Sequence, residues 1–343
     1  MAEVPMSTVV KDRIRTAARQ LGAADPVAYV GSVLDRAFPL PLGDDRYAAN
    51  WLAPGTAPFE PSYSESEPGA LRFTVEPLGP GASPVSRRDE ATRENRRLAG
   101  QTFGKDALRW FDERSEEWRG LHGIGSMAYG AWFGSAYDRD GLAATKVYYE
   151  LSPCNFGSLP PRLASMARAA AQEMPSLIPV FTSISCRRHG GAQRVTFLHA
   201  GPLRVKDLEP LLTRLQLSHH LPALLQIVGV TMGGRFELPG ESVLLSLGES
   251  PEGPEVRLEI LLGRVPDLPP QFLDLLALSL SERPQHLMGL VRWLRAFTPQ
   301  NYSLPGDFSV MSVRVTPQRP AGVSLYLRPI EFEVGAPRVA IPA

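Results

Sequence analysis

Residues 57–80 read APFEPSYSESEPGALRFTVEPLGP, and this stretch decides the fold prediction. Its two halves, 59–65 and 70–77, each alternate polar and apolar residues, and a polar turn with Pro-Gly joins them. Alternation with a period of two is typical of a β-strand with two different faces. The stretch therefore predicts a β-hairpin. Its second strand has a polar face and an apolar face, formed respectively by Arg72, Thr74, Glu76 and by Phe73, Val75.

Four more pairs of alternating segments follow along the chain, each joined by a short turn. The expected strands are 125–137 with 144–151, 180–186 with 193–199, 243–248 with 256–262, and 308–315 with 322–329. Helical periodicity is found before and between the pairs. The expected helices are 8–37, 106–121, 160–174, 205–217, 270–280 and 284–297. We therefore predict an α+β fold in which a ten-stranded antiparallel β-barrel is surrounded by helices in ααββ repeats.

The second strand of each pair carries polar side chains two residues apart, and its other face is apolar. If helices cover the outside of the barrel, the apolar faces contact the helices and the polar faces point into the lumen. The polar faces contain cations and phenols, namely Arg72, Lys146, Tyr148, Arg194, Arg257 and Tyr326. Cations in such a lumen can hold a multiply charged anion such as a diphosphate through charge-assisted hydrogen bonds. A solvated sheet face is the alternative interpretation of the same pattern.

The composition favours a globular protein and restricts its partners. Lys plus Arg equals Asp plus Glu at 36 each, so the net charge gives no reason to expect nucleic acid as a partner. No run of 18 apolar residues and no signal peptide is found, so we expect no membrane span and a cytoplasmic location. We expect Cys154 and Cys186 to be free thiols and residues 1–343 to form a single domain.

The sequence predicts no metal site. Asp44-Asp45 begins like an Asp-rich Mg²⁺ motif, but no second Asp-rich segment follows. The histidines have no carboxylate or cysteine at a spacing that suits a metal. We therefore expect no metal and no cofactor beyond the substrates themselves.

Two stretches resemble a known family. Pro58-Phe59-Glu60 followed by Leu71-Arg72-Phe73-Thr74-Val75-Glu76-Pro77 is similar to the paired strands of the dimethylallyltryptophan synthase family of aromatic prenyltransferases, and Thr145-Lys146-Val147-Tyr148-Tyr149 resembles its Lys-x-Tyr strand. Weaker similarities, at 193–195 and 323–326, follow in the same order. The resemblance implies the ααββ (ABBA) prenyltransferase barrel. It also implies transfer of a prenyl group, with dimethylallyl expected, from its diphosphate to an aromatic acceptor such as tryptophan or another indole, without a metal.

The resemblance also implies roles for individual residues. Glu60 would be the catalytic acidic residue that accepts or orients the indole N–H proton. The diphosphate would be bound by Arg72, Lys146, Tyr148, Arg194, Arg257 and Tyr326. Further candidates for the lumen or the acceptor site are Tyr129, Trp132, Thr196, Glu259 and Arg328.

The chain departs from the family pattern in two strands. Thr196 and Leu198 stand where the family has Lys and Tyr, and Glu259 stands where a Tyr is usual. Two alternatives therefore stay open beside a prenyltransferase for small aromatic molecules. One is a prenyltransferase that acts on a peptide side chain, and the other is a non-catalytic barrel that binds an isoprenoid or an aromatic metabolite.

Overall fold

The computed structural model describes residues 4–119, 127–151 and 159–334. Cys154 lies outside the described residues, as do the last two residues of the expected helix 106–121 and the first two of the expected strand 125–137. Cys186 is described and is a buried free thiol.

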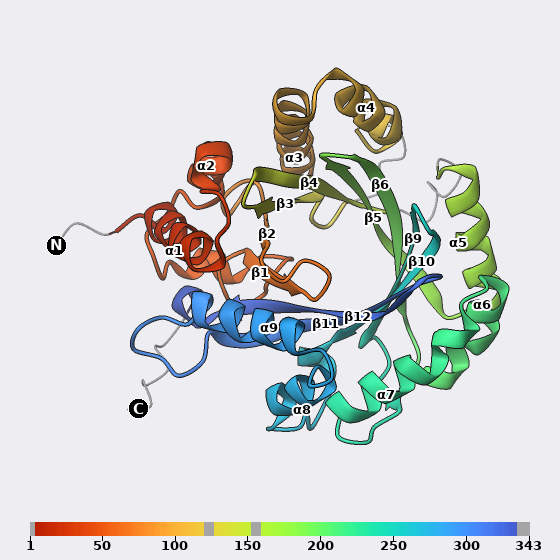
Figure 1. Ribbon diagram of the computed structural model, residues 1–343. Coiled ribbons are helices and arrows are strands. Elements are labelled where there is room, and N and C mark those ends of the chain that lie inside the picture. Colours follow the sequence, from red (N-terminus) through yellow and green to blue (C-terminus); the bar gives the residue numbers. More distant parts are fainter. Residues whose placement is uncertain (1–3, 120–126, 152–158, 335–343) are drawn as a thin grey trace.

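Ten strands of the described chain close into a barrel, in the order β1-β12-β11-β10-β9-β6-β5-β4-β3-β2. All neighbouring strands in the barrel are antiparallel. The predicted ten-stranded antiparallel barrel is thus confirmed (Figure 1). The strands are β1 (Phe59–Ser64), β2 (Leu71–Val75), β3 (Ala131–Asp138), β4 (Gly141–Glu150), β5 (Leu177–Arg187), β6 (Gly190–His199), β9 (Val243–Ser250), β10 (Gly253–Leu261), β11 (Gly306–Thr316) and β12 (Arg319–Pro329).

The five hairpins predicted from the sequence are all present, and they give the barrel two different ends. Each hairpin joins two strands that are consecutive in the chain, and the strands alternate in direction around the barrel. All five hairpin turns must therefore lie at one end, which we call the hairpin end. The helical connections between hairpins begin and finish at the other end, which we call the connection end.

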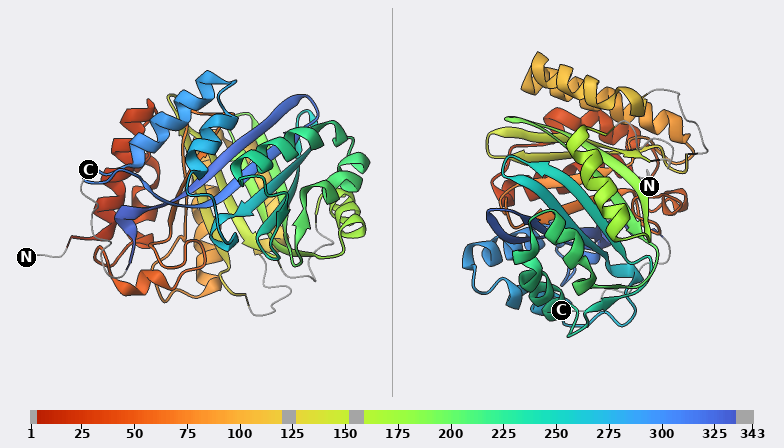
Figure 2. Two further views of the ribbon diagram at one scale, coloured as in Figure 1. Left: turned by 90° about the horizontal axis from the view of Figure 1, so that it is seen from below. Right: turned by 90° about the vertical axis from the view of Figure 1, so that its right-hand side faces the viewer.

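Helices cover the outside of the barrel, as the two further views also show (Figure 2). Helix α3 packs on β3 and β4, α4 on β5 and β6, and α5 on β6 and β9. Within the described chain, none of these helices is both long and apolar enough to cross a membrane. The α-helices of the described chain are α1 (Met6–Leu21), α2 (Val27–Ala37), α3 (Pro84–Leu98), α4 (Lys105–Arg119), α5 (Pro161–Glu173), α6 (Glu209–Arg214), α7 (Leu221–Thr231), α8 (Phe272–Ser279) and α9 (Pro284–Phe297). A two-stranded sheet of β7 (Leu203–Arg204) and β8 (Glu237–Leu238) accompanies them.

Three helical regions differ from the prediction, and one of them is α3, which was not among the expected helices. The expected helix 8–37 is divided into α1 and α2, because Gly22 adopts a left-handed conformation (φ 75°) that ends α1 and Pro26 precedes α2. Helix α7 was not predicted, since the expected helix 205–217 was followed by a pair of histidines and Pro222. Pro222 is compatible with a helix because it occupies the first turn, where its missing N–H is not needed.

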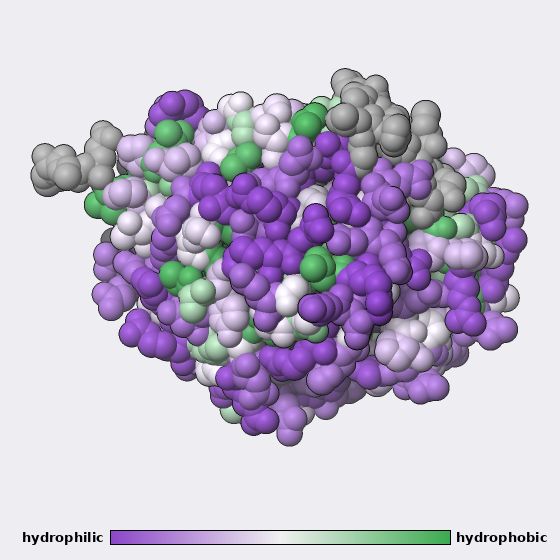
Figure 3. All heavy atoms as spheres, turned by 90° about the horizontal axis from the view of Figure 1, so that it is seen from above, coloured by the Kyte–Doolittle hydropathy of each residue, from purple (hydrophilic) through white to green (hydrophobic). Residues whose placement is uncertain are grey.

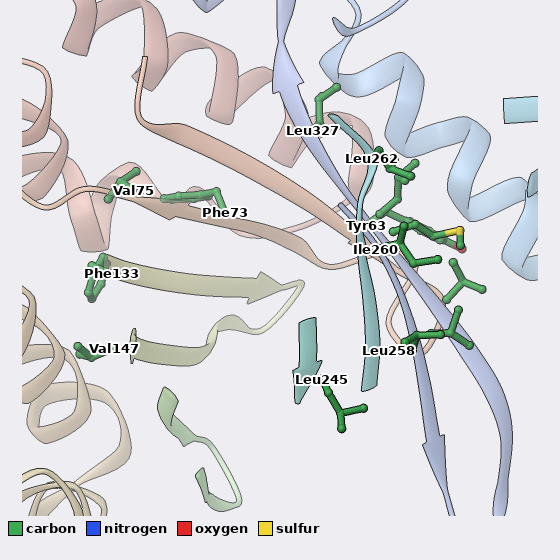
Figure 4. Close-up of a cluster of buried hydrophobic side chains, with 14 of the residues drawn as sticks. Tyr63, Phe73, Val75, Phe133, Val147, Leu245, Leu258, Ile260, Leu262 and Leu327 are labelled. Carbon is green, nitrogen blue, oxygen red and sulfur yellow. The ribbon is translucent and has the colours of Figure 1, made fainter. Parts of the chain in front are cut away.

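The apolar faces of the strands point outward to the helices, as predicted. Phe73, Val147, Leu258 and Leu325 belong to one buried hydrophobic cluster. Figure 4 shows such side chains on strands at opposite sides of the barrel, directed away from its interior. The surface over the upper helices of Figure 1 is mostly hydrophilic, with hydrophobic residues scattered on it (Figure 3). In a simple solvated sheet the polar face points outward to water. In this barrel the polar side chains point inward and the apolar ones outward, on strands at both sides of the barrel.

Glu65, at the end of β1, ties three elements together. Only 2% of its side chain is exposed, and its Oε2 accepts a hydrogen bond of 2.8 Å from the backbone N–H of Val323 in β12. Its Oε1 contacts the guanidinium of Arg283 and lies 2.7 Å from Nδ1 of His286 in α9. The carboxylate thus joins β1, β12 and α9 where the first and last strands close the barrel.

We expect Glu65→Ala to lower the free energy of unfolding by about 3 kcal/mol, because it leaves three buried or half-buried donors, on Val323, Arg283 and His286, without their acceptor. Urea unfolding followed by circular dichroism measures the change. The matched control is Asp207→Asn, which breaks the exposed Arg204–Asp207 ion pair and should change stability by less than about 0.5 kcal/mol. Equal effects of the two substitutions would contradict the role given to Glu65.

Candidate functional site

A pocket at the hairpin end of the barrel lumen is lined by six cationic side chains. It lies among the inward faces of β1, β2, β3, β4, β5, β6, β10, β11 and β12. All six residues expected to bind a diphosphate line this pocket: Arg72, Lys146, Tyr148, Arg194, Arg257 and Tyr326. Arg187 and Arg314 line it as well. The structure therefore brings together six cations and two phenols that are dispersed over more than 250 positions of the sequence.

Arg187 and Arg314 were missed by the sequence analysis because each lies on the first strand of its hairpin, and only second strands were searched for cations. A signal was present. Arg314 follows Ser312, and Arg187 follows Ser185, at the two-residue spacing that marks one face of a strand.

The backbone gives Arg194 its place in the pocket. Arg194 of β6 lies opposite Gly248 of β9 in the register of the two strands. A Cβ atom at position 248 would overlap the Cγ atom of Arg194. Glycine at this position therefore leaves the space that the arginine side chain needs.

The cations repel one another. Burial lowers the pKa of Lys146 well below its ordinary value, and the positive charges of Arg194 and Arg257 lower it further. Burial also lowers the pKa of Arg187 to about 10, again with a contribution from Arg194. A site that confines like charges in this way favours an anion, which would stabilise the charged form of every one of these groups.

Two glutamates at the hairpin end interact with these cations in different surroundings. Glu255 is buried and contacts both Arg257 (2.8 Å) and Arg194 (3.5 Å). Burial alone would raise its pKa, but the two guanidinium groups prevail and hold the pKa at about 2. Glu67 pairs with Arg72, and its side chain is 51% exposed. Among the described residues that line the pocket, Glu67 supplies the carboxylate.

The phenol of Tyr148 connects the cations with an aromatic cluster. Lys146 Nζ donates a 3.1 Å hydrogen bond to the Tyr148 hydroxyl and lies 4.8 Å from the centre of its ring. The ring of Tyr148 contacts Phe181 and Trp132, with centroid distances of 5.6 and 6.2 Å. Aromatic faces at this place can stabilise a cation that forms beside the pocket.

Glu60 lies toward the connection end, near the start of β1, and is 7% exposed. Its Oε1 accepts a 2.6 Å hydrogen bond from the hydroxyl of Ser309. Burial raises the pKa of Glu60 to about 7, although Ser309 and the charge of Arg328 oppose the rise. A carboxyl group with a pKa near neutrality can accept a proton and release it again at physiological pH.

Tyr129 and Trp132 form an aromatic wall at the same end. Their rings are stacked, with centroids 4.3 Å apart and planes 10° from parallel. Glu150 holds the backbone of this segment through 2.8 Å hydrogen bonds from the N–H groups of Tyr129 and Gly130. The indole N–H of Trp132 has no hydrogen-bond partner in the part of the chain that the structure describes. It is therefore a donor that a bound molecule could use.

The other three acceptor candidates, Thr196, Glu259 and Arg328, lie outside the described lining of the cationic pocket and have different surroundings. Thr196 is buried, and its hydroxyl lies 2.6 Å from that of Ser246, so these two groups satisfy each other. Burial raises the pKa of Glu259, and the positive charges of Arg257 and Arg194 oppose this rise. Arg328 is close enough to Glu60 to lower the pKa of that carboxyl. None of these three is among the described residues that line the cationic pocket.

No protein-family model and no curated protein matches the sequence. Solved structures do match. The 6-dimethylallyltryptophan synthase from Micromonospora olivasterospora in complex with DMASPP and Trp superposes with a TM-score of 0.74 at 17% identity, over 97% of this chain and 100% of that chain.

Two more of the similar structures are those of the prenyltransferase PriB and of AnaPT. The apo form of the prenyltransferase PriB gives a TM-score of 0.71 at 18% identity, over 99% of this chain and 100% of that one. AnaPT from Neosartorya fischeri gives 0.68 at 14% identity, over 95% and 93%. The chain therefore has the prenyltransferase barrel fold, and the resemblance found in the sequence is confirmed at the level of fold.

The crowding of cations leads to a prediction for Lys146. We expect Lys146→Met to weaken the binding of inorganic diphosphate roughly tenfold to a hundredfold, because one charge-assisted hydrogen bond is lost. The same variant should unfold at a higher temperature than the unaltered protein, since the substitution removes a buried, repelled charge. Calorimetric titration and thermal unfolding measure the two effects. A variant that loses both binding and stability would contradict this account of the pocket.

Proposed function

We propose that this protein is an aromatic prenyltransferase, with the whole chain forming one catalytic domain. It would transfer an allylic prenyl group, dimethylallyl in the first instance, from its diphosphate to an indole-type acceptor such as tryptophan. The observation that carries the proposal is the lumen itself, with six cations and two phenols at the hairpin end and a carboxyl group and stacked aromatic rings toward the connection end.

The cationic pocket is suited to the diphosphate of the donor. Arg72, Lys146, Arg194 and Arg257 would neutralise its charge, and the hydroxyls of Tyr148 and Tyr326 would donate to its oxygens. In the proposed reaction the allylic C–O bond breaks, and the diphosphate leaves with the bonding electrons. Because the cations stabilise the leaving anion, they lower the barrier to this step.

The remaining allylic cation would be held between the pocket and the aromatic cluster. Tyr148, Phe181 and Trp132 would shield it from water and stabilise it through their π faces. A carbon of the acceptor ring would then attack the cation and form the new C–C bond. The acceptor would lie against Trp132 and Tyr129, and Glu60 would accept a proton from it.

We further propose that the reaction needs no metal ion. The cationic side chains that line the pocket would supply the charge neutralisation that a divalent cation supplies elsewhere. The direct experiment is to incubate the protein in EDTA with five-, ten- and fifteen-carbon allylic diphosphates and a panel of aromatic acceptors. Products are read by mass spectrometry, and an added C₅H₈ unit on an indole is the expected result.

The same experiment separates the two alternatives. Product from a Trp- or Tyr-containing peptide, but not from free tryptophan, would indicate a prenyltransferase that acts on peptides. Binding of the allylic diphosphate without product from any acceptor would indicate a binding barrel.

Glu60 gives the reaction a specific pH dependence. The ionised carboxylate is the form that accepts a proton, and its pKa is raised to about 7. We therefore expect the rate to increase as the pH rises through about 7. Glu60→Gln should lower turnover by roughly 10²–10⁴ and remove this rise. Steady-state rates between pH 5 and 9 test both points.

Ser309→Ala is the companion variant, which should shift the rise to higher pH because it removes a hydrogen bond that favours the ionised form of Glu60. Unaltered turnover of the Glu60 variant would exclude Glu60 as the base.

A further inference from the structure

Glu67 occupies a position that the proposed reaction does not explain. It lies on the turn between β1 and β2, and its carboxylate pairs with Arg72. It lines the cationic pocket and also a second cleft outside it, at the hairpin end. Arg187 lines both cavities as well. Glu67 and Arg187 therefore stand where the inner pocket and the outer cleft meet.

The carboxylate of Glu67 interacts with three of the six pocket cations. It contacts Arg72 directly, and the charges of Arg187 and Arg314 also favour its ionised form, so its pKa lies below the ordinary value despite partial burial. A diphosphate in the pocket would need the same cations. Two anions cannot share them without repulsion, so the carboxylate and the diphosphate must compete.

The backbone around Glu67 is fixed, so the competition concerns its side chain. The turn is closed by hydrogen bonds from Glu67 N–H to Ser64 O (3.1 Å) and from Ala70 N–H to Glu67 O (3.0 Å). Pro68 packs so closely on Gly289 of α9 that a Cβ at position 289 would overlap it. The side chain of Glu67, in contrast, is half exposed and borders the outer cleft.

Glu255 provides a contrast beside the same pocket, in the lining of a neighbouring cavity. Its side chain is 10% exposed and contacts both Arg194 and Arg257. A buried carboxylate of this kind positions its two arginines. Glu67 has an exposed route to turn away from its arginine, and Glu255 has far less room to do so.

We infer that Glu67 is a displaceable counter-ion of the diphosphate site. It pairs with Arg72 while the pocket is empty, turns toward the outer cleft when a diphosphate enters, and competes with the diphosphate product so that release is faster. This inference rests on the proposed function, because it takes the pocket to be the diphosphate site. It adds a residue that lowers the affinity for the anion.

The experiment is a calorimetric titration of the full-length protein with inorganic diphosphate in EDTA. We expect Glu67→Gln to bind it about fivefold to tenfold more tightly than the unaltered protein, since removal of a nearby negative charge at a half-exposed site is worth on the order of one power of ten. Glu67→Ala should show the same direction. A gain in affinity is a result that a merely structural defect would not produce.

The matched control is Glu252→Gln. Glu252 lies on the turn between β9 and β10 at the same end of the barrel and pairs with Arg319 (2.6 Å). It borders a neighbouring cavity and is absent from the described lining of the cationic pocket. We expect its substitution to change the affinity less than about twofold.

The outcomes separate the inference from the proposed function. Tightening by more than twofold in both Glu67 variants, without tightening in the control, supports the inference. Unchanged or weaker binding in the Glu67 variants overturns the inference and leaves the diphosphate site intact. If the unaltered protein does not bind inorganic diphosphate, both the inference and the proposed function fail.

Discussion

The confinement of like charges inside a closed barrel is the constraint on which the rest of the structure depends. Isolated cations in such a place would be strongly destabilising, since each loses much of its hydration. The protein balances part of this charge with carboxylates, Glu255 in a buried contact and Glu67 in a half-exposed one. The remaining positive charge makes the lumen electrostatically suited to an anion.

The barrel architecture separates two kinds of chemistry along one axis. Because every hairpin turn lies at the same end, residues near the turns gather there, and residues near the helical connections gather at the other end. The cations belong mostly to the first group, whereas Glu60 and Trp132 belong to the second. Tyr148 lies between the two groups and contacts both. An anionic leaving group and an aromatic acceptor could thus be held on opposite sides of a short-lived cation.

The two departures from the family pattern, at Thr196 and Glu259, have different consequences in the structure. Thr196 is paired with Ser246 and withdrawn from the pocket. Glu259 lies beside the cations, and burial raises the pKa of its carboxyl group although their charges oppose the rise. The carboxylates act on Arg257 in the other direction. Burial would lower the pKa of Arg257, but the charges of Glu255 and Glu259 favour its charged form and raise the pKa. The charge balance of this lumen therefore differs from what a shell of cations and phenols alone would give.

The sequence by itself determined the strand pairs and the two faces of the second strands, one of which carries cations, and it favoured a cationic lumen over a solvated sheet face. These follow from local periodicity, which depends only on residues close together in the chain. Six of the residues that line the pocket, from Arg72 to Tyr326, could therefore be named in advance.

Only the tertiary structure decided which charges meet. Arg187 and Arg314 join the pocket through the closure and register of the barrel, and the same closure brings their charges near Glu67. The raised pKa of Glu60 arises from burial and from Ser309, which is 249 positions away in the chain. Such contacts connect distant residues, and no local pattern encodes the distance between them.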